Sequence, residues 1–329
     1  MTMNKQKVLK KVIENRLESR EAVQEVRVDP DLLLKESRRI ANAFRVVDGD
    51  RFRLADVDPA DTQKFTAKDK PLFGEAVTLA VEALAELQDR LLAQGQWAVL
   101  LVFQAMDAAG KDGLIKHVMS GLNPQGCEVS SFKSPSPEDL DHDFLWRCVK
   151  CLPKRGRIGI FNRSYYEETL VVRVHKELLA GQKIPPQLVT ADLWKERFQD
   201  IRGFERYLTR NGVVIRKFFL HVSKGQQRKR FIERLENPEK NWKFSANDIR
   251  ERAHWDGYMT AYEDMIRNTS TPDAPWYVVP ADNKWFTRVV VISAVLETLS
   301  AMGLRYPKLG KEKLRNFAAI KETLLRGDA

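Results

Sequence analysis

Residues 105–113 have the character of a phosphate-binding loop. They read Ala-Met-Asp-Ala-Ala-Gly-Lys-Asp-Gly and keep the second glycine and the lysine of the pattern G-x-x-x-x-G-K-[ST], at Gly110 and Lys111. Ala105 replaces the first glycine, and Asp112 replaces the hydroxyl residue. Backbone N–H groups of such a loop surround a phosphate, and the lysine reaches the transferring group. A chance turn before a helix is the alternative, but an apolar strand before the loop and a helix after it favour phosphate binding. The expected phosphate-binding residues are Ala108, Ala109, Gly110, Lys111, Asp112 and Gly113.

Asp107 adds a carboxylate to this loop. A carboxylate beside bound phosphate repels it unless a cation lies between the two. Mg²⁺ prefers carboxylate and phosphate oxygens, so Asp107 is the first candidate for a metal ligand. A turn cap is its alternative role.

A second polar group follows another apolar run. Residues 158–168 read Ile-Gly-Ile-Phe-Asn-Arg-Ser-Tyr-Tyr-Glu-Glu. Because ligands of open α/β sheets bind at the carboxyl ends of strands, this segment is expected beside the phosphate loop. Arg163 would then offer a planar fork to phosphate oxygens, unless it is a surface residue. Glu167 and Glu168 face a metal, a nucleotide or solvent.

The elements that must position these residues alternate between strand and helix. Apolar runs predict strands over 97–103, 127–132, 157–161, 213–222 and 276–279. Helical patterns cover 72–94, 137–149, 191–208, 246–267 and 286–302. Such alternation predicts an α/β fold with a doubly wound parallel sheet flanked by helices. Residues 1–70 are charged and rich in turns, which indicates an extension packed on the core.

Composition limits the class of partner. Among 329 residues, 55 Lys and Arg face 45 Asp and Glu, and this net charge of +10 favours a polyanionic partner. Nucleic acid, phospholipid headgroups, nucleotides and polyphosphate all fit, and the charge alternatively serves solubility. No apolar run approaches a membrane span, and the first residues lack a secretory pattern, so we expect a cytoplasmic protein without a membrane. Cys148 and Cys151 lack the partners of a zinc site and are expected to be structural thiols.

The two polar segments together resemble the polyphosphate kinase 2 family. The resemblance rests on Phe-Gln-Ala-Met-Asp-Ala-Ala-Gly-Lys-Asp at 103–112 paired with Phe-Asn-Arg-Ser-Tyr-Tyr-Glu at 161–167, and it is closest to class III members. Further similar stretches lie at 141–147, 172–175, 233–243 and 280–286, so the resemblance covers about 70–305.

The resemblance implies a P-loop kinase domain over 71–305, with a helical lid at about 223–255 and a C-terminal tail at 306–329. It implies Mg²⁺ as cofactor, with Mn²⁺ as the alternative ion, and polyphosphate together with AMP, ADP and ATP as substrates. Asp107, Lys111, Arg163 and Glu167 are then the catalytic residues, and Asp107 and Glu167 the metal ligands. Arg228 and Arg230 lie in the lid, and the choice of catalytic arginine between them stays open. Lys133 and Arg173 are expected to line the groove for the polymer, unless they are ordinary surface cations.

One position departs from many members, which have Asp where this chain has Asn162. Metal binding is therefore expected to depend on Asp107, with Glu167 assisting. Glu167 stands where members limited to diphosphates usually have Asn, and in class III members the glutamate accompanies use of monophosphates.

The expected activity is direct in-line phosphoryl transfer between polyphosphate and AMP or ADP, without a covalent enzyme intermediate. An ATP-dependent nucleoside or nucleotide kinase is the nearest alternative, since it would share the loop and lid. A nucleic-acid-binding module with a degenerate phosphate loop is the second alternative, but the chain has no RNP, KH or C₂H₂ signature, so we expect no nucleic-acid partner. A homo-oligomer is expected.

Overall fold

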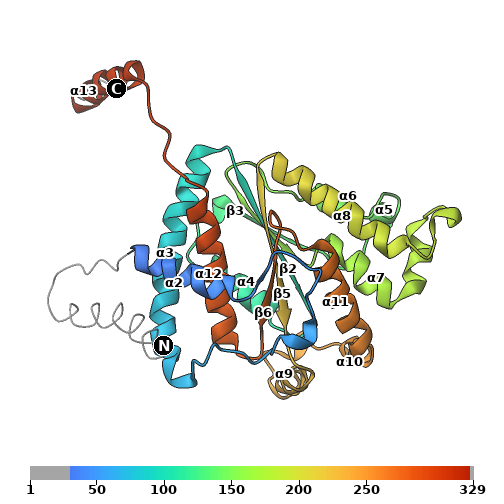
Figure 1. The fold of residues 1–329 in the computed structure, drawn as a ribbon. Coiled ribbons are helices and arrows are strands. Elements are labelled where there is room, and N and C mark those ends of the chain that lie inside the picture. Colours follow the sequence, from blue (N-terminus) through green and yellow to red (C-terminus); the bar gives the residue numbers. More distant parts are fainter. Residues whose placement is uncertain (1–29, 327–329) are drawn as a thin grey trace.

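The protein, in a computed structural model that describes residues 30–326, is built on one six-stranded sheet (Figure 1). The first 29 residues of the expected N-terminal extension and residues 327–329 of the tail lie outside the described residues. The strands lie in the order β1-β6-β5-β2-β4-β3. Their bounds are β1 Arg45–Val46, β2 Ala98–Ala105, β3 Cys127–Ser131, β4 Ile158–Asn162, β5 Val213–His221 and β6 Trp276–Pro280.

Five of the strands are parallel, as the sequence predicts, and the expected α/β doubly wound fold is confirmed. All eight residues of β2 and all five of β6 are buried, which explains why these strands are apolar at every position except Gln104. The strand β1 was not predicted: it pairs antiparallel with β6, Arg45 opposite Tyr277. The N-terminal extension therefore supplies an edge of the sheet.

Helices cover both faces of the sheet (Figure 1). The helix α12 packs against α2, α3 and α4 on one face, while α8, α11 and α7 pack together on the other. The bounds of these helices are α2 Pro30–Asn42, α3 Lys70–Gln94, α4 Lys111–Met119, α7 Val171–Val174, α8 Leu193–Arg210, α11 Trp255–Thr269 and α12 Lys284–Ala301.

Two helices expected to be continuous are broken. The predicted helix 137–149 is two short helices, α5 Pro137–Leu140 and α6 Trp146–Val149, because the carboxylate of Asp143 accepts a hydrogen bond from the N–H of Leu145 and forms a turn between them. The predicted helix 246–267 is α10 Ala246–Ala253 followed by α11, with His254 outside helical geometry.

The segment expected to form the lid lies at the carboxyl ends of the strands. It consists of α9 Lys224–Glu236, the short 3₁₀ helix η7 Asn241–Lys243 and α10. Ser223 caps α9 by accepting from the N–H of Gln226 at 3.1 Å, and its own Oγ donates to Asp282 at 2.7 Å. The start of this segment is thus tied to the loop that follows β6.

The tail contains a helix, α13 Lys311–Arg326, that stands away from the body in Figure 1. Every residue of α13 is exposed. No helix in the range 30–326 has the length and apolar character needed to cross a bilayer.

Candidate active site

The loop after β2 turns sharply into α4. Ala108 and Gly110 adopt φ values of 60° and 106°, a region that favours glycine, and Gly110 lies immediately before the first residue of α4. The carbonyl of Gly110 accepts from the N–H of Leu114 at 3.0 Å, so α4 begins directly at the loop. All six predicted phosphate-binding residues line one cavity, Ala108 to Gly113.

Lys111 lies at the centre of this loop and is 9% exposed. Its Nζ donates to the carbonyl of Ala105 at 3.0 Å. Burial, with a smaller contribution from Arg163, lowers the pKa of Lys111 to about 8, even though Asp107, Glu167 and Asp112 act in the opposite direction. Burial removes the water that would stabilise the charged ammonium. A bound phosphate would replace that stabilisation with negative charge and would keep Lys111 protonated.

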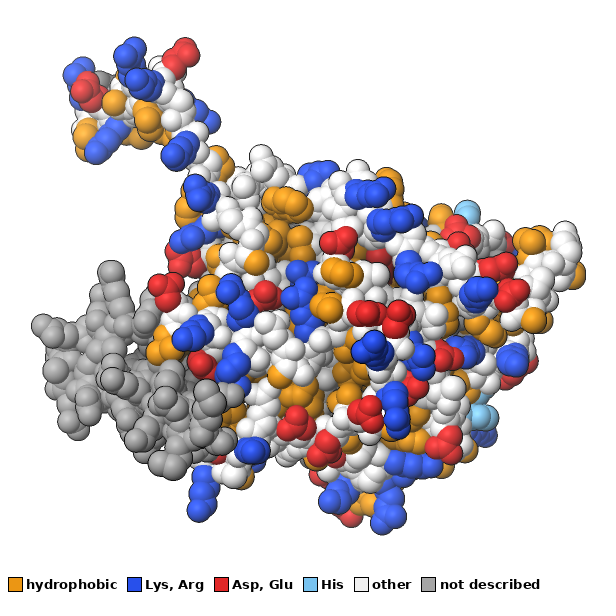
Figure 2. Space-filling view, viewed as in Figure 1, with side chains coloured by type: hydrophobic (Ala, Val, Ile, Leu, Met, Phe, Trp, Pro, Cys, Tyr) orange, Lys and Arg blue, Asp and Glu red, His pale blue; other side chains and the backbone are white. Residues whose placement is uncertain are grey.

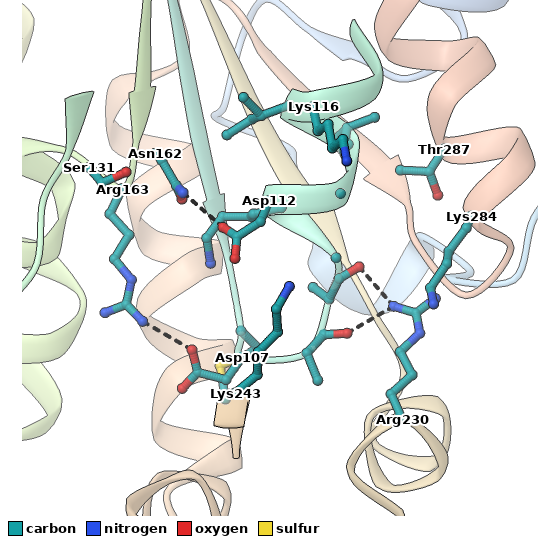
Figure 3. A pocket seen from close by; sticks show the side chains of 18 of the residues that line it. Asp107, Asp112, Lys116, Ser131, Asn162, Arg163, Arg230, Lys243, Lys284 and Thr287 are labelled. Carbon is teal, nitrogen blue, oxygen red and sulfur yellow. Dashed lines mark hydrogen bonds and ion pairs between the residues drawn. The ribbon is translucent and has the colours of Figure 1, made fainter. Parts of the chain in front are cut away.

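Arg163 joins two of the predicted catalytic carboxylates. Its Nη2 lies 3.0 Å from Asp107 Oδ1 (Figure 3). Its Nη1 lies 3.2 Å from Glu167 Oε2. Glu167 and then Asp107 raise the pKa of Arg163, against the effect of burial. The structure therefore brings Asp107, Lys111, Arg163 and Glu167 together, although Glu167 reaches the cavity only through Arg163 and does not line it.

A buried network fixes the segment that carries Arg163 and Glu167. The hydroxyls of Tyr165 and Tyr166 both donate to Glu205 Oε1 at 2.8 Å, and Lys217 Nζ donates to Glu205 Oε2 at 2.6 Å. Glu205 belongs to α8 and Lys217 to β5, so the 3₁₀ helix η4 Tyr165–Thr169 is anchored to the sheet and to one covering helix. Satisfied buried networks of this kind rigidify what they hold.

Asn162, at the end of β4, is hydrogen bonded to a residue of the phosphate loop. Its Nδ2 donates to Asp112 Oδ1 at 2.9 Å, which joins β4 to the first turn of α4 (Figure 3). Asp112 is exposed and lines the cavity. The sequence expectation considered only Asp107 and Glu167 as carboxylates near a metal, and Asp112 is a third.

The two candidate lid arginines differ completely in their surroundings. Arg230 is 4% exposed, and its guanidinium donates to the carbonyls of Ala108, Ala109, Ala281 and Asp282 at 2.6–3.1 Å. Arg228 is exposed and does not line the cavity. Arg230 thus holds the backbone of the phosphate loop. Arg234, one turn later on α9, also lines the cavity and pairs with Asp248 at 3.6 Å.

The cavity has a volume of about 1010 Å³ and is strongly basic. Ten Lys and Arg side chains line it against three carboxylates, far more cations than a single nucleotide triphosphate requires. Figure 2 shows Lys and Arg side chains gathered at the lower end of the molecule, over α9. The basic residues come from six separate segments of the sequence: Lys111, Lys116, Lys133, Arg163, Arg230, Arg234, Lys240, Lys243, Lys284 and Arg288.

Two predictions about the polymer groove have different outcomes in space. Lys133 lines the cavity, but Arg173 lies outside it and pairs with Asp264 of α11. Sequence reasoning missed six of the lining cations, because single exposed lysines and arginines carry no pattern. Lys284 and Arg288 had a weak signal: they lie four residues apart, on one face of the helix that follows β6.

The residues present fit a magnesium ion. The described residues hold no cluster of three or more His, Cys, Asp or Glu that could enclose a metal. Mg²⁺ needs none, since it usually takes one or two carboxylates, water and the substrate's phosphates. Asp107 and Asp112 provide carboxylates on the phosphate loop itself.

A phosphate loop at the carboxyl ends of parallel strands, within a basic cavity that α9 also lines, defines a P-loop phosphotransferase. The chain belongs to the polyphosphate kinase 2 family, whose family model matches residues 68–307. The resemblance inferred from the sequence is thereby confirmed.

Named relatives cover most of the chain. The ADP-polyphosphate phosphotransferase of Rhodopseudomonas palustris is 47% identical over 283 residues, which is 84% of this chain and 98% of the relative. The AMP/ADP-polyphosphate phosphotransferase of Meiothermus ruber is 45% identical over 265 residues, which is 80% of this chain and 95% of the relative. The crystal structure of polyphosphate kinase 2 from Arthrobacter aurescens TC1 superimposes with a TM-score of 0.78 at 40% identity, covering 86% of this chain and 96% of that one.

Proposed function

We propose that the protein transfers phosphoryl groups between inorganic polyphosphate and adenine nucleotides, converting AMP to ADP and ADP to ATP. The observation that carries this proposal is the excess of ten cations over three carboxylates in the cavity around the phosphate loop. A polymer with one negative charge or more on each phosphate needs such a surface, whereas a nucleotide alone does not. The names of the relatives from R. palustris and M. ruber support the same substrates.

The reaction is a direct in-line transfer. An oxygen of the nucleotide's terminal phosphate attacks the terminal phosphorus of polyphosphate, a new P–O bond forms, and the anhydride bond to the rest of the polymer breaks. The polymer leaves one phosphate shorter. Lys111 and Arg163 neutralise the charge that develops on the transferring group, and the lid excludes water.

Mg²⁺, or Mn²⁺ in its place, would add Lewis-acid stabilisation of the phosphate oxygens and would be held by carboxylates of the loop, Asp107 first. Glu167 as a further metal ligand stays a prediction, because its carboxylate is paired with Arg163 here.

The assay for this function is ATP formation from ADP and long-chain polyphosphate with Mg²⁺ and no other phosphate donor. Transfer by the wild-type protein and its loss in Lys111→Ala are expected. Formation of two ADP from ATP and AMP in the absence of polyphosphate, without any polyphosphate-dependent reaction, would instead identify the ATP-dependent kinase.

We also propose a homo-oligomer that works in the cytoplasm, where nucleotides are held. The exposed apolar side chains of α13, among them Leu314, Phe317 and Leu324, support assembly, because a surface of this kind is usually covered by a partner. Light scattering coupled to gel filtration, on the full chain and on a chain ending at residue 309, tests it: a monomer in both cases would reject the oligomer.

A further inference from the structure

At two positions around the phosphate loop, the charged and the neutral residue stand in the opposite places from those in most P-loop proteins. P-loop proteins usually hold their cation with the hydroxyl residue that follows the loop lysine and with a carboxylate at the end of a neighbouring strand. In this chain the first position is Asp112 and the second is Asn162, and the two side chains are hydrogen bonded at 2.9 Å. The charge usually found on the strand has moved to the loop, and the neutral group has moved to the strand.

We propose that Asp112 is a carboxylate ligand of the divalent cation in this enzyme, and that Asn162 is a positioning residue that orients it. The proposal rests on the proposed function, since the cation would be shared with the phosphates of the substrates. It assigns to Asp112 a role that the sequence interpretation gave to Asp107 and Glu167.

The surroundings of the three carboxylates favour Asp112. Arg163 occupies an oxygen of Asp107 and an oxygen of Glu167, so either must share its charge with a guanidinium before it can bind a cation. Asp112 makes no ion pair within residues 30–326, and its one side-chain partner is the neutral amide of Asn162. Figure 3 shows this amide at one carboxylate oxygen, with Asp112 facing the loop and Asp107.

Asn162 suits the positioning role for a chemical reason. An amide nitrogen donates one hydrogen bond without supplying charge, so it fixes the carboxylate and leaves its affinity for a cation intact. An aspartate at position 162 would instead face the carboxylate of Asp112 across 2.9 Å and repel it. The residue types at the two positions therefore depend on each other.

The structural alternative is that Asp112 only stabilises the N-terminus of α4 through the helix dipole. The two roles predict different binding results. A carboxylate that faces phosphates without a cation repels them, so Asp112→Asn should strengthen binding of metal-free ADP. If Asp112 is a ligand, the same variant should weaken binding of the cation, whereas a helix-stabilising residue would affect neither by more than its small effect on folding.

The experiment measures Mn²⁺ binding by electron paramagnetic resonance, on full-length protein saturated with ADP and without polyphosphate. Asp112→Asn is expected to raise the dissociation constant of Mn²⁺ about tenfold or more. Asp89→Asn, an exposed carboxylate of α3 at the opposite end of the sheet, is the matched control and is expected to change nothing. The exchange variant Asp112→Ser with Asn162→Asp is expected to bind Mn²⁺ within about threefold of wild type, because it restores the usual pair.

A change of metal preference separates ligation from positioning. Asp112→Cys is expected to lose Mn²⁺ and to gain Cd²⁺, since thiolate is a soft ligand. Asp89→Cys reports the Cd²⁺ bound by an exposed thiol and by the native cysteines. A dissociation constant of Mn²⁺ within twofold of wild type in Asp112→Asn, or equal Cd²⁺ binding by the two cysteine variants, would overturn the proposal. Absence of polyphosphate-dependent transfer in wild type would reject the proposed function instead and is scored separately.

Discussion

Replacement of Arg230 by methionine is expected to destabilise the phosphate loop, because it removes the hydrogen bonds that hold the loop's backbone. The methionine keeps most of the apolar stem and removes the guanidinium that donates to four backbone carbonyls, two on the loop and two after β6. Those carbonyls would remain buried without a donor. The variant therefore tests whether this arginine positions the loop or contacts phosphate.

The magnitude follows from two opposing effects. Each hydrogen bond from a charged donor contributes about 1.5–3 kcal/mol net. Removal of the guanidinium also removes the cost of burying its charge, which lowers the pKa of Arg230. We expect the free energy of unfolding to fall by about 3–5 kcal/mol, because each buried carbonyl left without a donor costs about 1–3 kcal/mol and several are left at once.

The assay is urea unfolding followed by circular dichroism, with Arg228→Met as the matched control. Arg228 is two residues away on the same helix and is exposed, so its replacement is expected to change stability by less than about 0.5 kcal/mol. Polyphosphate-dependent activity of Arg230→Met should fall with the loss of loop order. Equal stability of the two variants would refute the positioning role, and normal stability with lost activity would mean that Arg230 contacts phosphate.

Four further predictions concern the cavity. Lys111→Ala and Asp107→Ala should each lower the rate of ATP formation from ADP about a hundredfold or more with an unchanged melting temperature; near-normal rates would reject the mechanism. Since the pKa of Lys111 is lowered to about 8, kcat/KM should fall as the pH rises above about 8, where the lysine loses its charge, and Lys111→Arg should move that limb upward. Glu167→Asn should sharply reduce AMP→ADP conversion and largely spare ADP→ATP, and equal retention of both rates would remove this glutamate's class III role. Polyphosphate affinity should fall steeply with salt, and Lys284→Ala with Arg288→Ala should flatten the slope by roughly 1.4–1.8, about 0.7–0.9 for each lost phosphate contact, as measured by titration from low to high salt.

The sequence predicted most of the sheet because a buried strand has a recognisable apolar pattern in its own residues. A strand buried on both faces, such as β2, is apolar at nearly every position, and this pattern can be read without knowledge of its neighbours. The strand β1 has two residues and half-buried side chains, so only its partner β6 defines it, and no local pattern could reveal it. The break between α10 and α11 escaped for a related reason, since both halves keep a helical apolar period.

For the site, too, the sequence predicted the residues that lie close together in the chain and missed those that only folding brings together. The residues of the phosphate loop and of the end of β4 are consecutive, and their spacing carried the prediction. The role of Arg230 was hidden, because its partners are carbonyls, which exist at every position and leave no mark in the sequence. The basic lining was hidden because it is assembled from helices and loops that meet only in the folded chain.

The pairing of β1 with β6 sets an order of events during synthesis. A ribosome releases Arg45 long before Tyr277, and the two strands cannot pair until the second has emerged. Until then β1 has no partner strand, and once β6 joins β5 its outer edge stays open until β1 returns to it. Open edges of this kind are sites where newly made chains associate wrongly. The segment that carries β1 is therefore made early but can complete the sheet only after β6 has emerged, and its pairing then covers the edge of the sheet.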